Sequence, residues 1–218
     1  THALGWDRPG GRRRAMRPGV GVDEELHTRR LLLRRFRASD GPALHDYLSR
    51  PEAVRFEPYP VQGADDCALL ASQRAADPDF WAVCLDGGPL VGNLWLHRDE
   101  PASWLTWELG YVFHPGHWGN GYAFEAASAL LTTCFGAWGA HRVHAECDPR
   151  NTPSWRLLER LGFRREGHLR ANASFATAPD GAPEWQDTYL YALLAGEWAA
   201  PAERDARAGI GEPAPDKP

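Results

Sequence analysis

The sequence predicts a mixed α/β domain, and three observations support this fold class. The first half combines three strand-like and two helix-like segments, strand and helix patterns alternate from about residue 104 to residue 161, and two further strand-like segments follow. The 218 residues suffice for one sizeable core, and the apolar and charged fractions are those of ordinary globular proteins.

The first half of the domain combines one strand, two helices and a hairpin. Residues 31–37 predict a strand, after which Ser39 or Asp40 caps a helix that continues to Leu48. A second helix fits residues 64–76. The segments 80–85 and 90–97 flank the turn sequence Asp-Gly-Gly-Pro and are expected to pair as a hairpin.

The second half contains four strands and two helices. Residues 104–113 alternate as a strand does, and the next apolar stripe, from Ala123 to Phe135, has helical spacing and ends near Gly136. Residues 142–147 predict a strand and 152–161 a short helix, with Gly162 at its C-cap. The last two strands are predicted at 164–170 and 185–194.

Both ends of the chain differ from this core in composition. Residues 1–24 are rich in Gly, Pro and Arg, and residues 199–218 are rich in Pro, Ala and charge. Neither segment has an apolar period, so we expect two flexible tails around a domain at residues 25–198.

Charge and composition limit the partners. The net charge of −5 argues against general nucleic-acid binding, which needs a basic surface. No apolar run is long enough to span a membrane, and no apolar segment of a secretory signal follows the arginines at 12–14. The four cysteines show no paired spacing, so we expect reduced thiols and a cytoplasmic protein.

The most informative segment is residues 107–127, WELGYVFHPGHWGNGYAFEAA, which predicts a strand, a glycine-bearing turn and a helix. The free N–H groups and the dipole of a helix N-terminus favour a phosphate or pyrophosphate. Phe124 and Glu125 do not fit a dinucleotide-binding glycine pattern, and a P-loop lysine is absent. From spacing alone, a tight strand-to-helix connection remains an equal alternative.

One carboxylate, Glu108, lies within this apolar strand. Alternation places it on the face of Thr106, Gly110 and Val112. A buried carboxylate there would have a raised pKa suited to a general base, whereas pattern alone slightly favours a solvated strand glutamate.

The segment WGNGYAFEAA, followed by HRVHAECDPRNTPSWRLLERLGFRREG, resembles the GNAT acyltransferase superfamily, and in particular its ribosomal-protein-alanine N-acetyltransferase branch. The resemblance extends from about Thr28 to Trp198. It implies a mostly antiparallel twisted sheet of about seven strands, about four flanking helices, and acetyl-CoA as cosubstrate. The turn that binds acyl-CoA would consist of Trp118, Gly119, Asn120, Gly121, Tyr122 and Ala123. Its first position is Trp instead of the usual Gln or Arg.

The resemblance also implies roles for other residues. Glu108 would be the base, a backbone N–H of Val112 or Phe113 would polarise the thioester carbonyl, and Asn151 would bond the pantetheine arm. Ser154 would donate to the leaving thiolate, because Leu158 stands where many members carry a tyrosine acid. A simpler interpretation is that Asn151 or Thr152 caps a helix.

The remaining candidates concern the acceptor and metals. The segment 56–59, which contains Phe56, Glu57 and Tyr59, would form a wall of the acceptor site, with a simple turn as an equal alternative. Asp187 is a candidate second carboxylate for which a structural role is favoured. The histidine pairs 114/117 and 141/144 lack companion ligands, so we expect no metal.

The resulting hypothesis is an N-acetyltransferase that moves an acetyl group from acetyl-CoA to a primary amine, either a protein N-terminal α-amine or a small molecule. Two alternatives stay open, namely a non-catalytic acyl-CoA sensor of the same fold and an interaction module built on the ten tryptophans. A homodimer is a candidate oligomeric state, which the sequence does not decide.

Overall fold

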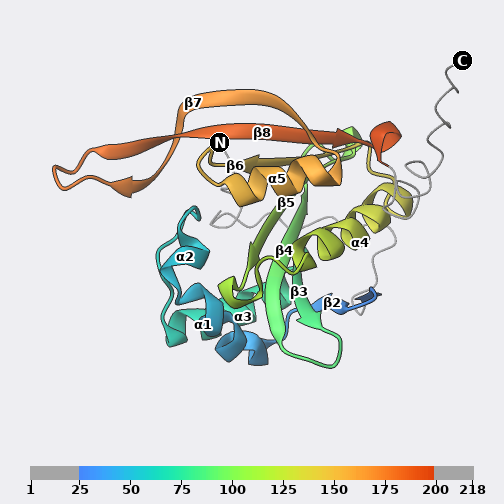
Figure 1. Cartoon of the computed structure of the whole chain (residues 1–218), viewed down its shortest axis with the longest axis horizontal. Coiled ribbons are helices and arrows are strands. Elements are labelled where there is room, and N and C mark those ends of the chain that lie inside the picture. Colours follow the sequence, from blue (N-terminus) through green and yellow to red (C-terminus); the bar gives the residue numbers. More distant parts are fainter. Residues whose placement is uncertain (1–24, 199–218) are drawn as a thin grey trace, which may run out of the picture.

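In the computed structural model, residues 25–198 form one eight-stranded sheet with helices on both faces (Figure 1). The predicted tails, 1–24 and 199–218, lie outside the described residues. The strand order is β1-β2-β3-β4-β5-β6-β8-β7, and every neighbouring pair is antiparallel except β5 and β6, which are parallel. The predicted mixed, mostly antiparallel fold is therefore confirmed.

The strands are β1 (Leu26–His27), β2 (Leu31–Arg35), β3 (Phe80–Leu85), β4 (Leu90–Arg98), β5 (Thr106–Phe113), β6 (Arg142–Cys147), β7 (Arg164–Thr177) and β8 (Pro183–Leu194). The helices are α1 (Gly41–Leu48), α2 (Pro51–Val54), α3 (Ala64–Ala76), α4 (Tyr122–Gly136) and α5 (Thr152–Leu161). Short 3-10 turns lie at Ala38–Asp40, Ala102–Trp104, Pro115–His117 and Ala195–Glu197.

Most predicted boundaries agree with these elements, and the differences have local causes. The strand predicted from residue 104 begins at Thr106, because Ala102–Trp104 form a 3-10 turn and Leu105 is left-handed, with φ 51°. The helix predicted from Ser39 or Asp40 begins at Gly41, after a 3-10 turn. Strand β7 extends beyond its predicted end at Arg170, through a register shift between Leu169 and Ala173.

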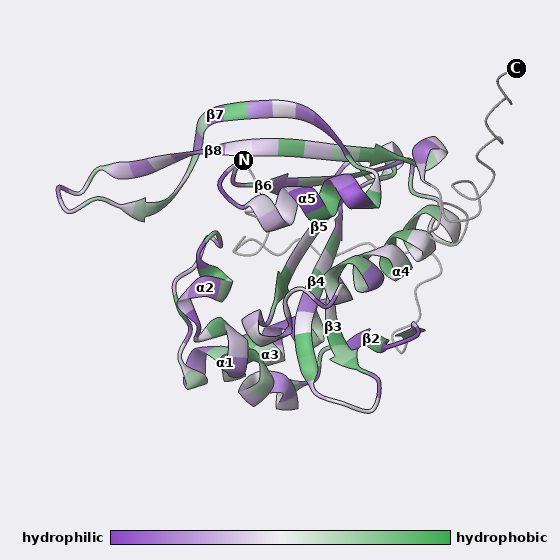
Figure 2. Ribbon diagram, viewed as in Figure 1, coloured by the Kyte–Doolittle hydropathy of each residue, from purple (hydrophilic) through white to green (hydrophobic). Residues whose placement is uncertain are grey.

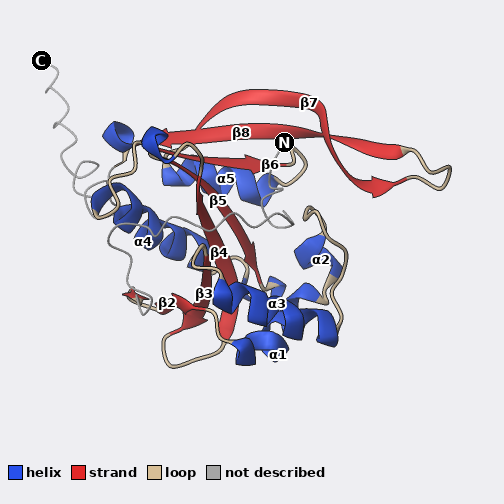
Figure 3. Ribbon diagram, turned by 180° about the vertical axis from the view of Figure 1, so that it is seen from behind, coloured by secondary structure: helices blue, strands red, loops and turns tan. Residues whose placement is uncertain are grey.

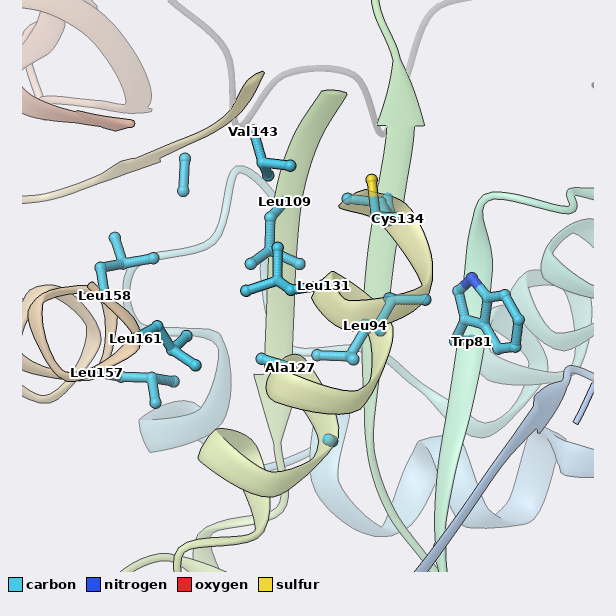
Figure 4. Close-up of a cluster of buried hydrophobic side chains, with 14 of the residues drawn as sticks. Trp81, Leu94, Leu109, Ala127, Leu131, Cys134, Val143, Leu157, Leu158 and Leu161 are labelled. Carbon is cyan, nitrogen blue, oxygen red and sulfur yellow. The ribbon is translucent and has the colours of Figure 1, made fainter. Parts of the chain in front are cut away.

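Two apolar clusters fix the helices on the two faces of the sheet. Helices α4 and α5 cover one face, where Ala127, Leu131 and Cys134 of α4 pack near strand residues such as Leu94 and Leu109 (Figure 4). The other cluster joins α1 and α3 to the opposite face. Each buried leucine stabilises the fold by about 1.5–3 kcal/mol, so these contacts determine where the helix ends lie.

Hydropathy along α5 follows the same arrangement. Hydrophilic and hydrophobic residues alternate along this helix in Figure 2, and Leu157, Leu158 and Leu161 are buried in the core. The amphipathic pattern therefore seats the helix against the sheet and fixes the position of its N-terminus.

Strands β5 and β6 separate along their length. Their pairing covers only three steps, from Thr106 opposite Arg142 to Glu108 opposite His144. Beyond Glu108 the two strands diverge, and the long β7–β8 hairpin continues past β6 (Figures 1 and 3). We call the opening between β5 and β6 beyond Glu108 and His144 the split; it separates the two halves of the sheet.

The structure also tests what the sequence predicted for the cysteines, the tryptophans and membrane-spanning segments. The four cysteines are free and buried. Trp81, Trp95 and Trp107 lie in the core, so the tryptophans do not form one binding surface. Among the described residues, no helix has both the length and the apolar character that crossing a membrane requires.

Candidate active site

The edge of β5 exposed by the split carries backbone groups without a strand partner on that side. The N–H of His114 donates to the Val91 carbonyl at 2.9 Å, so by alternation residues 110 and 112 also bond to β4. The backbone groups of Leu109, Tyr111 and Phe113 then point toward the space that β6 has left. Of the two candidates for polarising a carbonyl, the N–H of Phe113 faces the split and that of Val112 faces β4.

The turn after β5 leads directly into α4. Gly119 and Gly121 both have φ 78°, a left-handed conformation that glycine adopts without strain. The Asn120 amide donates to the carbonyls of His117 and Trp118, at 3.1 and 3.2 Å. The indole N–H of Trp118 donates to the Phe113 carbonyl at 2.8 Å. Tryptophan at the first position of the turn therefore ties the turn to the open edge of β5.

An arginine that the sequence analysis missed lies beside this turn. The guanidinium of Arg30 stacks over the Tyr122 ring at 4.7 Å and bonds Glu125 at 2.7 Å, while Thr28 donates to the same carboxylate at 2.6 Å. Burial alone would raise the pKa of Glu125, but its bonds to Thr28 and Arg30 outweigh burial and lower it. Arg30 and Glu125 are 95 residues apart, so no local pattern reveals the contact.

The start of α4 suits a pyrophosphate such as that of acetyl-CoA. Its first N–H groups have no partner within the helix, the dipole is positive at this end, and the Arg30 guanidinium lies nearby. A Cβ at Gly121 would lie 3.5 Å from Arg30 Nη2, so a larger side chain there would extend toward the guanidinium beside the helix start.

A pocket follows the split and joins segments far apart in the sequence. Five predicted site residues line it, namely Phe56, Glu108, Asn151, Ser154 and Asp187. Tyr59 is not among the lining residues and packs instead against the cluster under α1 and α3. The turn residues Trp118 to Ala123 lie outside this pocket, at the start of α4.

Glu108 lies at the point where β5 and β6 separate and is only 7% exposed. It is paired with His97 of β4 on one side and with His144 of β6 on the other. His97 Nδ1 lies 2.7 Å from Asp79, and His144 Nε2 lies 2.9 Å from Asp99. The carboxylate is therefore flanked by two histidine–aspartate pairs on adjacent strands.

Two of these acidic side chains and one histidine are residue types that can bind a metal ion. Asp99, Glu108 and His144 offer ligand atoms that all lie within 4.8 Å of one another, although no metal was expected from the sequence. The bond between His144 and Asp99 already satisfies two of the three. His114, another histidine considered in the sequence, accepts from the Gly116 N–H through Nδ1, and its Nε2 lies 3.2 Å from Asp46.

The opposite wall of the pocket is the N-terminus of α5. Asn151 is its N-cap, with its side chain accepting from the Ser154 N–H at 3.3 Å. The Ser154 hydroxyl lies 2.9 Å from that of Tyr111, whose pKa is raised by burial, so the phenol keeps its proton. Alternation placed Tyr111 on an apolar face, which hid this role. Leu158 is buried in the core.

Four further carboxylates line the pocket, namely Glu57, Glu146, Asp148 and Asp187. Burial raises the pKa of Glu57 to about 8, opposed by the positive charge of Arg74. Asp187 accepts from the Ala171 N–H at 2.8 Å and lies 2.7 Å from His168 Nε2, and these contacts lower its pKa. Asp187 thus anchors the irregular part of β7 while lining the pocket, and Glu57 lies in the segment 56–59 that the resemblance places at the wall of the acceptor site.

Comparison with known proteins places this geometry in a family. Residues 30–164 match the Acetyltransferase (GNAT) domain. The uncharacterized N-acetyltransferase YnaD of Bacillus subtilis is 34% identical over 79% of this chain and 98% of its own length. The ribosomal protein uS5-alanine N-acetyltransferase of Escherichia coli is 34% identical over 41% of this chain and 43% of its own.

Solved structures agree with these sequence matches. The crystal structure of a GNAT-family acetyltransferase from Bacillus anthracis has a TM-score of 0.71 and 34% identity, covering 80% of this chain and 100% of that one. The domain match spans more than half of the chain, and the relatives of similar length are N-acetyltransferases. The chain therefore belongs to the GNAT acetyltransferase family and is an acetyl-CoA-dependent N-acetyltransferase.

Proposed function

We propose that this enzyme transfers the acetyl group of acetyl-CoA to a primary amine by direct attack, with Glu108 as the base and Ser154 as the donor to the leaving thiolate. One observation carries the proposal. Glu108 is a buried carboxylate at the point where β5 and β6 separate, and it lines the same pocket as Ser154. Acetyl transfer to an amine is assisted by a base, which takes up the proton that the amine loses, and by a hydrogen-bond donor, which stabilises the leaving thiolate.

The binding of acetyl-CoA is assigned to the residues beside this pocket. The turn from Trp118 to Ala123 and the first amides of α4 would hold the pyrophosphate. The open edge of β5 and the side chain of Asn151 would hold the pantetheine arm, and acetyl-CoA then supplies an activated thioester at the split. The N–H of Phe113, which faces that edge, is the candidate for polarising the thioester carbonyl.

The proposed reaction balances without a further reactant. The neutral amine attacks the carbonyl carbon, so that a C–N bond forms and the C–S bond breaks. The proton lost from the amine passes to Glu108 through water, and the sulfur leaves as a thiolate that accepts a hydrogen bond from Ser154. A hydrogen bond to developing charge contributes about 1.5–3 kcal/mol.

The need for the base depends on the acceptor. A lysine-like amine with a pKa near 10.4 is only about one part in a thousand neutral at pH 7.4, which costs roughly 4 kcal/mol. An α-amine with a pKa of about 7.7–8 costs well under 1 kcal/mol. Both a small-molecule amine and a protein N-terminus are therefore included in the proposal.

The test is a panel of amines and short peptides, incubated with the full chain and acetyl-CoA while free thiol is measured. We expect thiol release that depends on the amine, together with a product heavier by one acetyl group in mass spectrometry. Thiol release without any acetylated amine would indicate hydrolysis of the thioester and would contradict transfer to an amine.

A further inference from the structure

The segment between β5 and α4 begins with a histidine whose two ring nitrogens both have partners. His114 is only 8% exposed, and its Nδ1 accepts the backbone N–H of Gly116, with 2.9 Å between the two nitrogens. Its Nε2 lies 3.2 Å from Oδ2 of Asp46 on α1. Because Nδ1 is an acceptor, the single hydrogen of the neutral ring lies on Nε2, where it faces this carboxylate. The two contacts therefore fit the neutral form of the ring.

A series of hydrogen bonds connects this histidine to the turn that leads into α4. His114 is the N-cap of the 3-10 turn Pro115–His117, and its side chain holds the N–H of the second residue of that turn. The N–H of Trp118 donates to the Pro115 carbonyl at 3.1 Å. The Asn120 amide then donates back to the Trp118 carbonyl at 3.2 Å. The position of the chain in front of α4 thus depends on how the 3-10 turn is held at its start.

Titratable side chains from α1 and from the 3-10 turn face the His114 ring. Asp46 contacts it directly and also pairs with Arg50, which follows α1, at 3.4 Å. The ring of Tyr47 lies 6.4 Å from that of His114, and burial raises the pKa of this tyrosine, so its phenol stays neutral. The ring of His117 lies edge-on at 5.2 Å. Asp46 is therefore the charged group in contact with the ring.

Protonation of His114 would break one of its two bonds and keep the other. An imidazolium carries a hydrogen on both nitrogens, so Nδ1 would become a donor that faces the N–H of Gly116. Two donors 2.9 Å apart repel each other, and the turn would have to move away from the ring. The contact with Asp46 would persist, because Nε2 carries a hydrogen in both forms.

We propose that His114 is a positioning residue for acetyl-CoA. Its neutral ring holds the turn from Trp118 to Ala123 in place through Gly116, and protonation of the ring releases this turn and weakens the binding of acetyl-CoA. This inference rests on the proposed binding of the pyrophosphate at that turn. Because His114 acts on the turn, its effect is on the affinity for acetyl-CoA and not on the chemical step.

Two variants of similar shape separate the hydrogen bond from packing. Asparagine is a preferred N-cap residue whose side-chain oxygen can accept from the N–H two residues on, whereas leucine has no acceptor. We expect His114→Leu to raise the Kd of CoA in calorimetry by about 3- to 10-fold, and His114→Asn to stay within about twofold of the wild type. The KM for acetyl-CoA should follow Kd, with kcat nearly unchanged at saturating acetyl-CoA. His141→Ala, at an exposed histidine before β6, is the control and should match the wild type.

The pH profile is a readout that packing alone does not move. Histidines change charge between about pH 8 and pH 5. As pH falls through this range, the Kd of the wild type should rise relative to that of His114→Asn and approach the Kd of His114→Leu. Groups that all three proteins share, such as His117 and the phosphates of CoA, cancel in this comparison.

Three results would overturn the inference: CoA affinity of His114→Leu equal to that of the wild type, equal losses in His114→Leu and His114→Asn, or a ratio of wild-type to His114→Asn affinity that does not change with pH. Calorimetry with CoA does not depend on acetyl transfer. A wild-type protein that binds CoA but acetylates no amine would therefore refute the proposed function and leave the role of His114 standing on its own measurements.

Discussion

The hydroxyl of Tyr111 lies 2.9 Å from Oγ of Ser154 and 3.1 Å from its backbone oxygen. Strand β5 is thereby bonded to the first turn of α5 across the pocket. Because burial raises the pKa of Tyr111, its phenol keeps its single hydrogen, which it can donate to the Ser154 backbone oxygen or to Oγ. When Oγ is the acceptor, the hydroxyl hydrogen of Ser154 is available for another acceptor, which in the proposed reaction is the leaving sulfur.

Replacement of Ser154 by alanine tests this role. We expect Ser154→Ala to lower kcat by about 10- to 150-fold, the equivalent of about 1.5–3 kcal/mol, with less change in KM for acetyl-CoA. Steady-state kinetics and a melting curve on the same sample provide the measurement. A lower Tm with unchanged kcat would show that Ser154 only helps α5 to begin.

Removal of the Tyr111 hydroxyl should act through Ser154. Tyr111→Phe keeps the ring in place, so we expect a smaller loss in kcat than in Ser154→Ala. Groups that act as a unit are not additive, and the double variant should therefore be no slower than Ser154→Ala alone. Multiplicative losses in the double variant would show that the two hydroxyls act independently.

Glu108→Gln should lower kcat by about 10²–10⁴ while leaving acetyl-CoA affinity near that of the wild type. The amide keeps the shape of the side chain but cannot accept a proton. The loss should grow with the pKa of the acceptor, because more basic amines depend more on the base. Kinetics across the amine panel, with calorimetry of CoA binding, measure both effects.

Glu52→Gln is the matched control, since it makes the same change on the exposed side of α2. Full activity of Glu108→Gln on every accepted amine would contradict its role as base. Asp187 was the alternative suggested by the sequence, but Ala171 and His168 already bond its two oxygens. Glu57 would then be the stronger candidate, because its raised pKa of about 8 suits a base near neutral pH.

Local sequence patterns predicted most of the fold, because most of its helices and strands are specified by residues within each segment. Helix α3 and strands β3 and β6 have the predicted bounds, and the Gly162 C-cap is left-handed with φ 95°. The errors arose where tertiary contacts extend or shorten an element. Strand β7 continues past Arg170 because its partner β8 offers a long edge, and its irregularity is fixed by the Asp187 bond to Ala171.

The site was predictable only in part, for the same reason. The strand–turn–helix segment pointed to Glu108 and the glycines, and the helix start pointed to Ser154. Glu146 and Arg30 carry no local signal, since their place at the site depends on contacts across the sheet or on the split between β5 and β6. Glu57 was indicated only as a member of the segment 56–59, without a role of its own. A single sequence contains the residues of such a pocket, but it does not show that they lie together in the folded protein.

The left-handed glycine at the start of α4 gives a fourth prediction. Gly121→Leu should weaken CoA binding at least about tenfold, because the side chain would extend toward the Arg30 guanidinium beside the helix start. Backbone strain at φ 78° should also cost about 1–2 kcal/mol of stability. Calorimetry with CoA and thermal unfolding separate the two effects.

Gly87→Leu is the matched control for strain. Gly87 has φ 63° in the turn between β3 and β4, and a Cβ added there would meet no atom within 4 Å beyond its chain neighbours. The variant should lose similar stability while binding CoA normally. Equal CoA affinity in both variants would show that the pyrophosphate does not contact the start of α4.

The raised pKa of Glu57 gives a fifth prediction, on stability against pH. In the folded protein this carboxyl holds its proton until about pH 8, whereas in the unfolded chain it releases it near 4.5. Between these values the folded state binds more protons, so the contribution of Glu57 to stability is complete below about pH 4.5 and is lost as pH rises toward 8. The slope for one group is at most about 1.4 kcal/mol per pH unit.

Glu57→Gln removes this titration while keeping a neutral side chain of the same shape. We expect the variant to gain stability relative to the wild type as pH rises from 5 to 8, with the gain levelling off above about 8. Urea unfolding at several pH values measures the difference, and the exposed Glu52→Gln should show no such trend. A difference between Glu57→Gln and the wild type that is constant over this range would mean that Glu57 ionises at its ordinary pKa, because only a group that stays protonated in the folded state can make the two proteins diverge with pH.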